Sequence, residues 1–540
     1  MLALWAVPFS ACGGTPSETG KVDNTKTTLW VNNYDGGYGD AWLSDTIARF
    51  ETAYADYQGV DGKVGVQVKI NPIEQKGTEL IGTLSGSTDD IYFSENMNYN
   101  ELVSMKGALD ISDIVKATGS DNKTIQSKLT QDYEDYLNKG GEADKGVYYA
   151  LPHYEVTGGI VYNINLFEAN NWYFNESGKT FVRSDTEKRS KGPDNKPGTY
   201  DDGLPATYDD FFKLCDKIVD SICTPFIWSG TYGKAYWGYV LENAYADYEG
   251  YEQIMLNYTL KGTATNLVEK INDDGTVVLQ DPTPITGENG WKLYQQAGKY
   301  HALDFMDRAL SNSSYYDTRV TNPNHDNTTA EYDFIASPYE NGVKPVAMLI
   351  EGAYWYNEID DFGGFKRLES SFGVEKEDLK YGLMPMPKVD GKLGTEQVAT
   401  TMMDALCFIN ANIKKEKIDI AKKFVQFCYT DAEMQAFTIK TNTFKSMNYS
   451  LEGRQNELSN FGKELFKHKE SSKIIHKCSG NDFFQIDKDM FSLSFETSTY
   501  KYPFTAVFDY KKSAKEYFEL IKEDSLYSEA TWNKVFKDIL

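Results

Sequence analysis

The pattern of apolar and polar positions changes most sharply between residues 147 and 167. Two apolar segments, 147–151 and 159–162, are rich in the β-branched and aromatic residues that favour strands. Between them runs the polar, aromatic stretch PHYEVTG, in which Pro152 has no N–H to give to a strand ladder. This pattern predicts a chain that leaves one sheet and enters another. The residues expected at the boundary between the two resulting lobes are His153, Tyr154 and Glu155.

The N-terminal part predicts the start of a parallel sheet. Residues 27–31 form a short apolar β run, and after a polar loop residues 41–54 place apolar side chains at helical spacing. Residues 64–70 then alternate like a strand. The same reasoning predicts a helix at 77–84 and a further strand at 89–93, so strands and helices alternate along the chain.

Further amphipathic helices are expected over much of the remaining chain, at residues 206–219, 291–306, 419–429, 513–521 and 532–536. At 540 residues the chain is too long for one ordinary core. Two large α/β lobes with insertions fit this length.

The charge of the chain excludes some partners. A net charge of -25 and a pI of 4.7 argue against nucleic acid and anionic lipid headgroups, because phosphates would be repelled. An acidic surface also keeps a secreted protein soluble, which is the simpler meaning of the charge. The 38 Tyr and 9 Trp are more informative, because many lie in polar surroundings. Their flat apolar faces and polar tips suit sugars and peptides.

The first residues resemble the end of a bacterial lipoprotein signal. A short apolar run leads to small residues and Cys12, the expected lipidation site, although there is no basic segment and Phe9 stands where Leu is usual. A buried N-terminal strand is the alternative. Residues 13–26 are polar and predict a flexible tether, so 1–26 is assigned to the signal remnant and tether. Because no run of 18 apolar residues follows, membrane contact is expected only through the lipid.

The remaining cysteines have neither paired spacing nor metal-type spacing. We expect buried free thiols at Cys215, Cys223, Cys407, Cys428 and Cys478. Cys215 and Cys223 form the only conceivable disulfide.

Three stretches, in order, carry a resemblance to a known family. The first is the crossover, where a proline and about ten mixed residues precede Tyr162-Asn163 and a Leu-Phe pair. The second is KPVAMLIEGAYW, from Lys344, and the third is YGLMPMP, from Tyr381. In this order, within matches from about residue 27 to 440, they resemble solute-binding protein family 1, the extracellular sugar-binding proteins of ABC importers, to which the maltose-binding protein belongs. The chain departs from the family at Asp89, where the family has proline.

The resemblance implies a two-lobed periplasmic-binding-protein-like α/β fold. Each lobe is expected to be a mostly parallel sheet flanked by helices, with hinge crossovers between the lobes. Lobe 1 would comprise residues 27–153 plus 408–445, and lobe 2 residues 154–407 plus 446–540, with an insertion at 171–205. The implied protein is a monomeric lipoprotein on the outer face of the cell membrane, which captures a carbohydrate and passes it to ABC permease subunits. It would need no cofactor.

The resemblance also implies which residues contact the ligand. By position in strand-end loops and signatures these are Asn33, Tyr34, Asp35, Glu95, Asn96, Trp228, Trp237, Glu351, Tyr354, Trp355 and Asp404, besides the three crossover residues. Tyr354 or Trp355 is expected to be the best aromatic platform. Alternatives remain for several of them. Glu95 would serve equally as a helix cap, and a tryptophan in a helix is more often core than platform.

The insertion contains a candidate cation site. Its segment GPDNKPGTYDDGLP gathers oxygen ligands around Gly198, as a structural Ca²⁺ requires. The candidate ligands are Asp194, Asn195, Asp201 and Asp202. The spacing is not that of an EF-hand, and an ordinary turn rich in Asp and Asn is the alternative.

Two other functions stay open at this point. Paired carboxylates could make the protein a glycoside hydrolase, with one acid and one base. No GxSxG, HExxH or complete P-loop motif is present, so other enzyme classes lose support. A peptide-binding lipoprotein of the same architecture is the second alternative, although the expected loops contain no arginine to pair with a peptide terminus.

Overall fold

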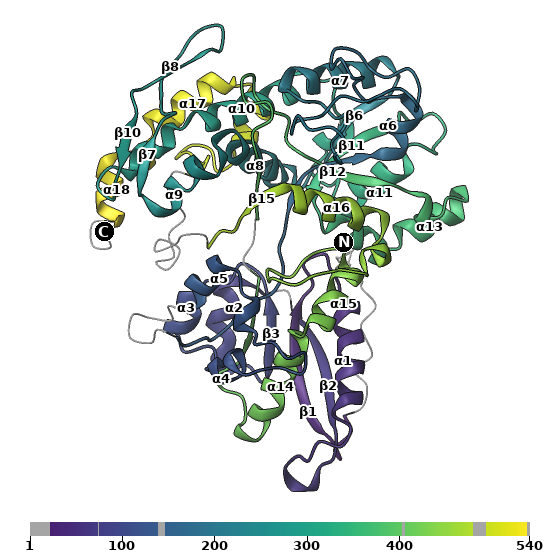
Figure 1. Ribbon diagram of the computed structural model, residues 1–540, viewed down its shortest axis with the longest axis vertical. Coiled ribbons are helices and arrows are strands. Elements are labelled where there is room, and N and C mark those ends of the chain that lie inside the picture. Colours follow the sequence, from purple (N-terminus) through teal and green to yellow (C-terminus); the bar gives the residue numbers. More distant parts are fainter. Residues whose placement is uncertain (1–21, 74, 139–145, 402–404, 479–492, 537–540) are drawn as a thin grey trace, which may run out of the picture.

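The computed structural model describes residues 22–73, 75–138, 146–401, 405–478 and 493–536. The fold is α/β and two-lobed, and each lobe has its own sheet with helices around it (Figure 1). This confirms the predicted fold class.

The sheet of lobe 1 has five strands in the order β2-β1-β3-β14-β4. Their bounds are Thr27–Tyr34 for β1, Val66–Ile73 for β2, Ile91–Ser94 for β3, Leu151–Pro152 for β4 and Leu406–Ile409 for β14. β1 pairs in parallel with β2 and β3, whereas β14 runs antiparallel to β3 and β4. The predicted strand, loop, helix and strand of the N-terminus are therefore confirmed, and one later strand reverses direction.

The helices of lobe 1 close an aromatic core against this sheet. They are α1 (Ala41–Ala53), α2 (Gly77–Thr83), α3 (Tyr99–Ser104), α4 (Ser112–Lys116), α5 (Gln131–Leu137), α14 (Ile418–Cys428) and α15 (Asp431–Thr441). Phe50 of α1 meets Phe424 of α14 at 4.9 Å between ring centroids, edge to face. Trp42 of α1 meets Phe93 of β3 in the same way at 5.2 Å. These contacts join residues far apart in the chain into one core.

The sheet of lobe 2 has the order β12-β5-β11-β6. The strands are β5 (Gly158–Asn163), β6 (Thr224–Ile227), β11 (Val346–Gly352) and β12 (Tyr381–Met384). β11 is parallel to β6, and β5 is antiparallel to both β11 and β12. In each lobe, then, one strand runs against the others, and every residue of β5 and β11 is buried.

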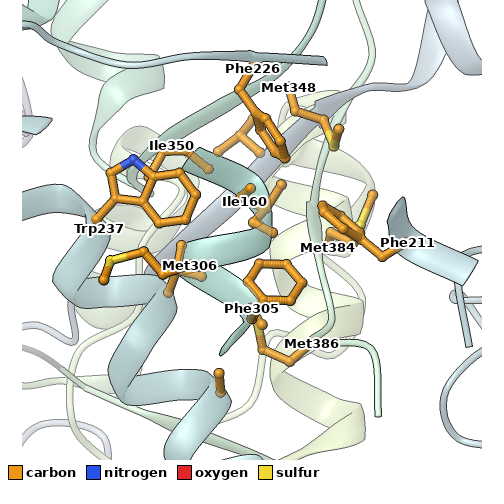
Figure 2. Close-up of a cluster of buried hydrophobic side chains, with 14 of the residues drawn as sticks. Ile160, Phe211, Phe226, Trp237, Phe305, Met306, Met348, Ile350, Met384 and Met386 are labelled. Atoms are coloured by element: carbon orange, nitrogen blue, oxygen red, sulfur yellow. The ribbon is translucent and has the colours of Figure 1, made fainter. Parts of the chain in front are cut away.

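Helices and small hairpins surround the second sheet. The helices are α6 (Ile164–Asn170), α7 (Tyr208–Asp220), α8 (Gly233–Ile254), α9 (Leu256–Thr259), α10 (Ala297–Ser311), α11 (Asn327–Ala336), α12 (Trp355–Asp361), α13 (Gly364–Phe372), α16 (Asn460–Ser471), α17 (Ala514–Glu523) and α18 (Glu529–Phe536). The hairpins pair β7 (Gly262–Ala264) with β10 (Thr283–Ile285), and β8 (Val268–Ile271) with β9 (Val277–Leu279). Figure 2 shows the core beneath them, where Trp237 lies among Phe226, Met306 and Ile350.

Three segments that link the lobes are residues 153–157, the stretch between β13 (Gln397–Thr400) and β14, and the stretch between α15 and α16. Residues 402–404, in the second of these, lie outside the described part of the chain. β13 pairs in parallel with β15 (Ser472–Ile475), close to these links. The strand pairing moves the expected lobe boundary, because β14 begins at Leu406 and places Leu406 and Cys407 in the sheet of lobe 1.

Two predicted elements differ because side chains take over backbone hydrogen bonds. Only Leu151 of the expected strand 147–151 lies in β4, since the backbone N–H groups of Tyr148 and Tyr149 donate to hydroxyl groups instead. The expected helix 291–306 is divided at Gln296, whose side chain donates to Glu249 at 3.0 Å and to the carbonyl of Gln253 at 2.9 Å. The backbone at Gln296 is not helical, with ψ of 134°, and the α-helix begins at Ala297.

The described cysteines agree with a further expectation. Cys215, Cys223, Cys407 and Cys428 are buried free thiols, and Cys478 is buried as well. Within the described residues, every helix is too short or too polar to cross a membrane.

Glu249 of α8 makes the stability of lobe 2 depend on pH. Burial raises the pKa of its carboxyl from 4.5 to about 7, although the N–H of Gly298 donates to it at 2.7 Å. The native protein therefore keeps this proton up to about pH 7, whereas the unfolded chain loses it near 4.5. The contribution is complete below pH 4.5 and is lost as the pH rises through 7, on the order of 1–3 kcal/mol.

Denaturant unfolding between pH 4.5 and 8 tests this expectation. The stability advantage of the native protein over Glu249→Gln should shrink as the pH rises. Glu252→Gln, at an exposed position three residues further along α8, is the matched control and should follow the native pH profile. A difference between native protein and Glu249→Gln that is independent of pH would contradict the shift.

Candidate functional site

The two lobes face each other at the ends of their central strands. β1 and β3 of lobe 1 end at Tyr34 and Ser94, and β11 of lobe 2 ends at Gly352. In open α/β sheets the carboxyl ends of strands are where ligands bind. The first crossover passes between these ends and brings Tyr154 to the same place. This interlobe region is the candidate site.

Five tyrosines from both lobes form a continuous row here, which we call the tyrosine row. It contains Tyr38, Tyr154, Tyr236, Tyr239 and Tyr354. Tyr38 meets Tyr154 at 4.8 Å and Tyr354 at 6.4 Å between centroids. The hydroxyls of Tyr239 and Tyr354 lie 3.1 Å apart. Tyr239 and Tyr354 come from lobe 2 but pack against the hydrophobic core of lobe 1. The row therefore holds the two lobes in contact.

A glycine-rich loop lets lobe 1 approach lobe 2 closely. Gly36, Gly37 and Gly39 all have positive φ, which only glycine adopts easily. A Cβ at Gly37 would lie 3.1 Å from the Tyr354 ring. The Asp35 carboxylate holds the loop by accepting the N–H groups of Gly37 at 2.9 Å and Gly39 at 3.2 Å. The exposed Asp35 therefore has a structural role in the loop beside the site.

Glu95 lies at the lobe 1 wall of the site and is 1% exposed. It accepts a hydrogen bond from the Tyr154 hydroxyl and pairs with the Lys76 ammonium at 3.3 Å. That ammonium also lies 4.4 Å from the centre of the Tyr34 ring. Burial raises the pKa of Glu95, and Lys76 partly offsets the shift. Glu95 therefore lies in the interlobe region, and it does not cap α3, because the helix cap there is Asn98.

Glu351 lies at the lobe 2 wall and has no exposed surface. Its Oε1 accepts the N–H of Gly352 at 2.9 Å, and its Oε2 has no hydrogen-bond partner among the described residues. Burial and the nearby Glu358 raise the pKa of Glu351 well above that of an ordinary carboxyl. The Tyr354 ring folds back over Gly352, next to this carboxyl.

His153 and Glu155 join the crossovers instead of lining the site. His153 is 1% exposed, and its Nδ1 lies 2.9 Å from the Lys445 ammonium on the third linking segment. Burial lowers the pKa of His153 well below its usual value, and Lys445 adds to this shift. Glu155 pairs with Lys469 of α16 at 2.5 Å beside a small cavity. Both residues therefore hold hinge segments together.

Asn33 and Asn96 also lie outside the tyrosine row. The Asn33 side chain is buried in lobe 1 and donates to Asp40 at 2.6 Å. That contact explains why Asp40, at the N-cap position of α1, makes no side-chain cap. Asn96 is exposed with φ of 51°, and its carbonyl lies beside Gly77. Neither side chain contacts a residue of the row.

The tryptophans expected as platforms lie in the core of lobe 2, which corrects that expectation. Trp237 and Trp355 have no exposed surface, and Trp228 has 1%. Trp228 and Trp237 meet edge to face at 5.6 Å, and Trp355 meets Tyr381 in the same way at 5.1 Å. Side chains of the core occupy their faces, so Tyr354 and not Trp355 faces lobe 1.

The candidate calcium loop is held by its own hydrogen bonds. The Asp201 carboxylate accepts the N–H of Asp194 at 3.1 Å and the Thr199 hydroxyl at 2.7 Å. Asp202 accepts the N–H of Gly198 at 2.7 Å, and Asn195 has a φ of 55°. Within the described residues no group of three or more acidic, His or Cys side chains is arranged to hold a metal ion. The geometry favours the turn alternative.

Two expected residues lie outside the described part of the chain, namely Cys12 and Asp404. Conversely, sequence reasoning did not include Tyr38, Tyr236 or Tyr239 among the candidate residues. The spacing of Tyr236 and Tyr239, three residues apart beside Trp237, marks a second helix face that could have revealed them.

Solved structures similar to this chain share its fold. The apo form of RafE from Streptococcus pneumoniae is 14% identical with a TM-score of 0.51, covering 93% of this chain and 98% of that one. A chitin oligosaccharide binding protein is 14% identical with a TM-score of 0.55, covering 94% and 99%. Maltose-bound MalE3 of T. maritima is 14% identical with a TM-score of 0.53, covering 92% and 98%. No curated protein sequence matches the chain.

A family model matches most of the chain. Residues 46–452 match the model described as bacterial extracellular solute-binding protein. This span includes the sheet of lobe 2, every strand of the lobe 1 sheet except β1, the chain up to α15, and the tyrosine row except Tyr38. The family is described as one of proteins that bind solutes outside the cell. Since most of the chain is matched, it belongs to the family of bacterial extracellular solute-binding proteins.

Proposed function

We propose that the protein captures an oligosaccharide between its lobes and delivers it to an ABC importer. The tyrosine row, with Glu95 and Glu351 on opposite walls, is the observation that carries this proposal. Aromatic rings cover the apolar C–H faces of a sugar, while carboxylates accept hydrogen bonds from its hydroxyls. The solved relatives include a chitin oligosaccharide binding protein and a maltose-bound protein, which supports the ligand class.

Ligand entry requires the lobes to separate. In the closed arrangement Tyr38 and Tyr354 contact each other, and the loop through Gly37 rests on the Tyr354 ring. Opening about the three linking segments would expose the rings, and closure over a sugar would expel water from around it. His153 contacts Lys445, and Glu155 contacts Lys469. Both contacts involve the linking segments about which the lobes would rotate.

The anchoring proposal rests on the sequence. Cys12 follows a short apolar run and precedes a polar tether, as in a lipidated surface protein. A monomer tethered in this way on the outer face of the membrane would remain close to the permease that accepts its ligand. Metabolic labelling with a fatty acid, lost on Cys12→Ala, would support the anchor.

One screen separates the proposal from its alternatives. The protein is incubated with oligosaccharides and peptides, thermal stability is measured, and products are separated by chromatography. A saturable stabilisation by sugar without products supports capture. Sugar cleavage supports a glycoside hydrolase, and stabilisation by peptides alone supports a peptide-binding protein.

Tyr354→Ala is expected to weaken oligosaccharide binding by about 1 to 3 kcal/mol, because the central ring of the row is lost. Tyr354→Phe, which keeps the ring and loses the hydroxyl near Tyr239, should cost less. Calorimetric titration measures both. Tyr510→Ala removes a tyrosine that is 66% exposed and serves as the control. Unchanged affinity in Tyr354→Ala would remove the ring from the site.

A further inference from the structure

The environment of the Glu351 carboxyl differs from what hydrogen bonding to sugar hydroxyls alone would require. Among the described residues its Oε2 accepts no hydrogen bond, although the side chain has no exposed surface. Three tyrosines of the row, Tyr236, Tyr239 and Tyr354, are close enough to feel its charge. A buried carboxyl beside aromatic rings is the usual setting for an organic cation, which the ring faces and the carboxylate attract together.

The opposite wall of the same site contains this arrangement with its cation present. There the Lys76 ammonium pairs with Glu95 at 3.3 Å and lies 4.4 Å from the centre of the Tyr34 ring. One tyrosine ring, one buried carboxylate and one ammonium form a complete set. Glu351 and Tyr354 repeat the ring and the carboxyl, without the ammonium.

No cation of the protein fills that place within the described residues. None of the ion pairs found there involves Glu351 or its neighbours Glu331 and Glu358. Glu331 also has no exposed surface, and neither of its carboxyl oxygens has a hydrogen-bond partner. Burial, together with the nearby Glu358 and Glu351, raises the pKa of Glu331 well above its usual value. Among the described residues, these three acidic groups of the lobe 2 wall therefore have no ion-pair partner.

We propose that Glu351, with the rings of Tyr236 and Tyr354, binds the ammonium group of a cationic ligand when the lobes open and close. This inference rests on the proposed function and deepens it, because for an oligosaccharide it means a sugar unit with a free amine. The ammonium would donate to the open Oε2 and lie against the rings. It would also offset the repulsion among Glu331, Glu351 and Glu358.

The test compares two tetrasaccharides that differ only in charge. One is a β-1,4-linked tetramer of glucosamine, and the other is the same tetramer with every amine acetylated. Calorimetric titrations of the native full chain at pH 6 are expected to show at least tenfold tighter binding of the amine tetramer. The preference should fall at higher salt, because screening weakens the ion pair.

Two variants test whether Glu351 causes the tighter binding of the amine tetramer. Glu351→Gln keeps the shape of the side chain and should reduce the preference to less than threefold. Glu369→Gln makes the same change at an exposed position of α13 and should leave the preference intact. A Glu351→Gln protein that retains the full preference would overturn the assignment to this residue.

The native protein alone decides the inference if the variant does not fold. Equal or tighter binding of the acetylated tetramer overturns it, and so does absence of binding of the amine tetramer. The proposed function is judged separately with neutral oligosaccharides such as maltotetraose. It fails only if neither charged nor neutral oligosaccharides bind.

Discussion

Trp355→Ala is expected to lower the free energy of unfolding by about 3 to 5 kcal/mol, the usual cost of removing a large aromatic side chain from a core. Trp355 has no exposed surface and meets Phe334, Tyr381 and Phe461 at 5.7, 5.1 and 5.5 Å between centroids. Its removal leaves a cavity that several rigid rings cannot fill. Denaturant unfolding followed by circular dichroism measures the loss.

Trp355→Phe fills part of that cavity and should cost less than half as much. Binding provides the contrast with the neighbouring residue. Folded Trp355→Ala protein should retain most of its ligand affinity, whereas Tyr354→Ala should lose affinity. If Trp355→Ala keeps native stability and loses binding, the indole faces the ligand and our placement of it is wrong.

The fold could be predicted because its strands are continuous apolar runs in a diagnostic order. β5 and β11 are buried along their whole length, so their sequences are apolar without alternation, as expected for central strands. Pro152 has no backbone N–H, and it lies in the two-residue edge strand β4. No further strand pairs on the outer side of β4, so no donor is needed there.

The site could be predicted only in part, because the rotation of a helix about its axis decides which aromatic side chain faces the other lobe. Tyr354 and Trp355 are adjacent at the start of α12, and one turns to lobe 1 while the other enters the core. In α8, Trp237 points into the core whereas Tyr239 packs with lobe 1. Both helices have two buried faces, so burial preference alone cannot separate core from platform.

The contacts of the crossover residues His153 and Glu155 could not be predicted for a related reason. The crossover is polar and aromatic whether its side chains meet a ligand or another part of the chain. Lys445, 292 residues further along the chain, pairs with His153, and its ammonium lies 4.5 Å from the centre of the Phe437 ring. A partner so distant in sequence leaves no local pattern that would predict the contact.

Asp247→Ala is expected to cost about 3 to 5 kcal/mol of stability, because it leaves a buried ammonium without its partner. Asp247 and Lys388 are 3% and 1% exposed, and their charged groups lie 2.6 Å apart. The same carboxylate accepts the N–H of Val398 at 3.1 Å, while Asn243 accepts that of Thr400 at 2.9 Å. Polar side chains of α8 thus hold the free edge of β13, which leads into the second crossover.

Unfolding in denaturant should show this loss for Asp247→Ala and a recovery of most of it for the double variant Asp247→Leu with Lys388→Met. The double variant removes both charges, so no unpaired ion stays buried. Lys423→Ala breaks an exposed pair with Asp419 on α14 and should change stability little, because water screens that pair. Equal losses in the single and double variants would show that α8 holds β13 through the Val398 hydrogen bond and not through the ion pair.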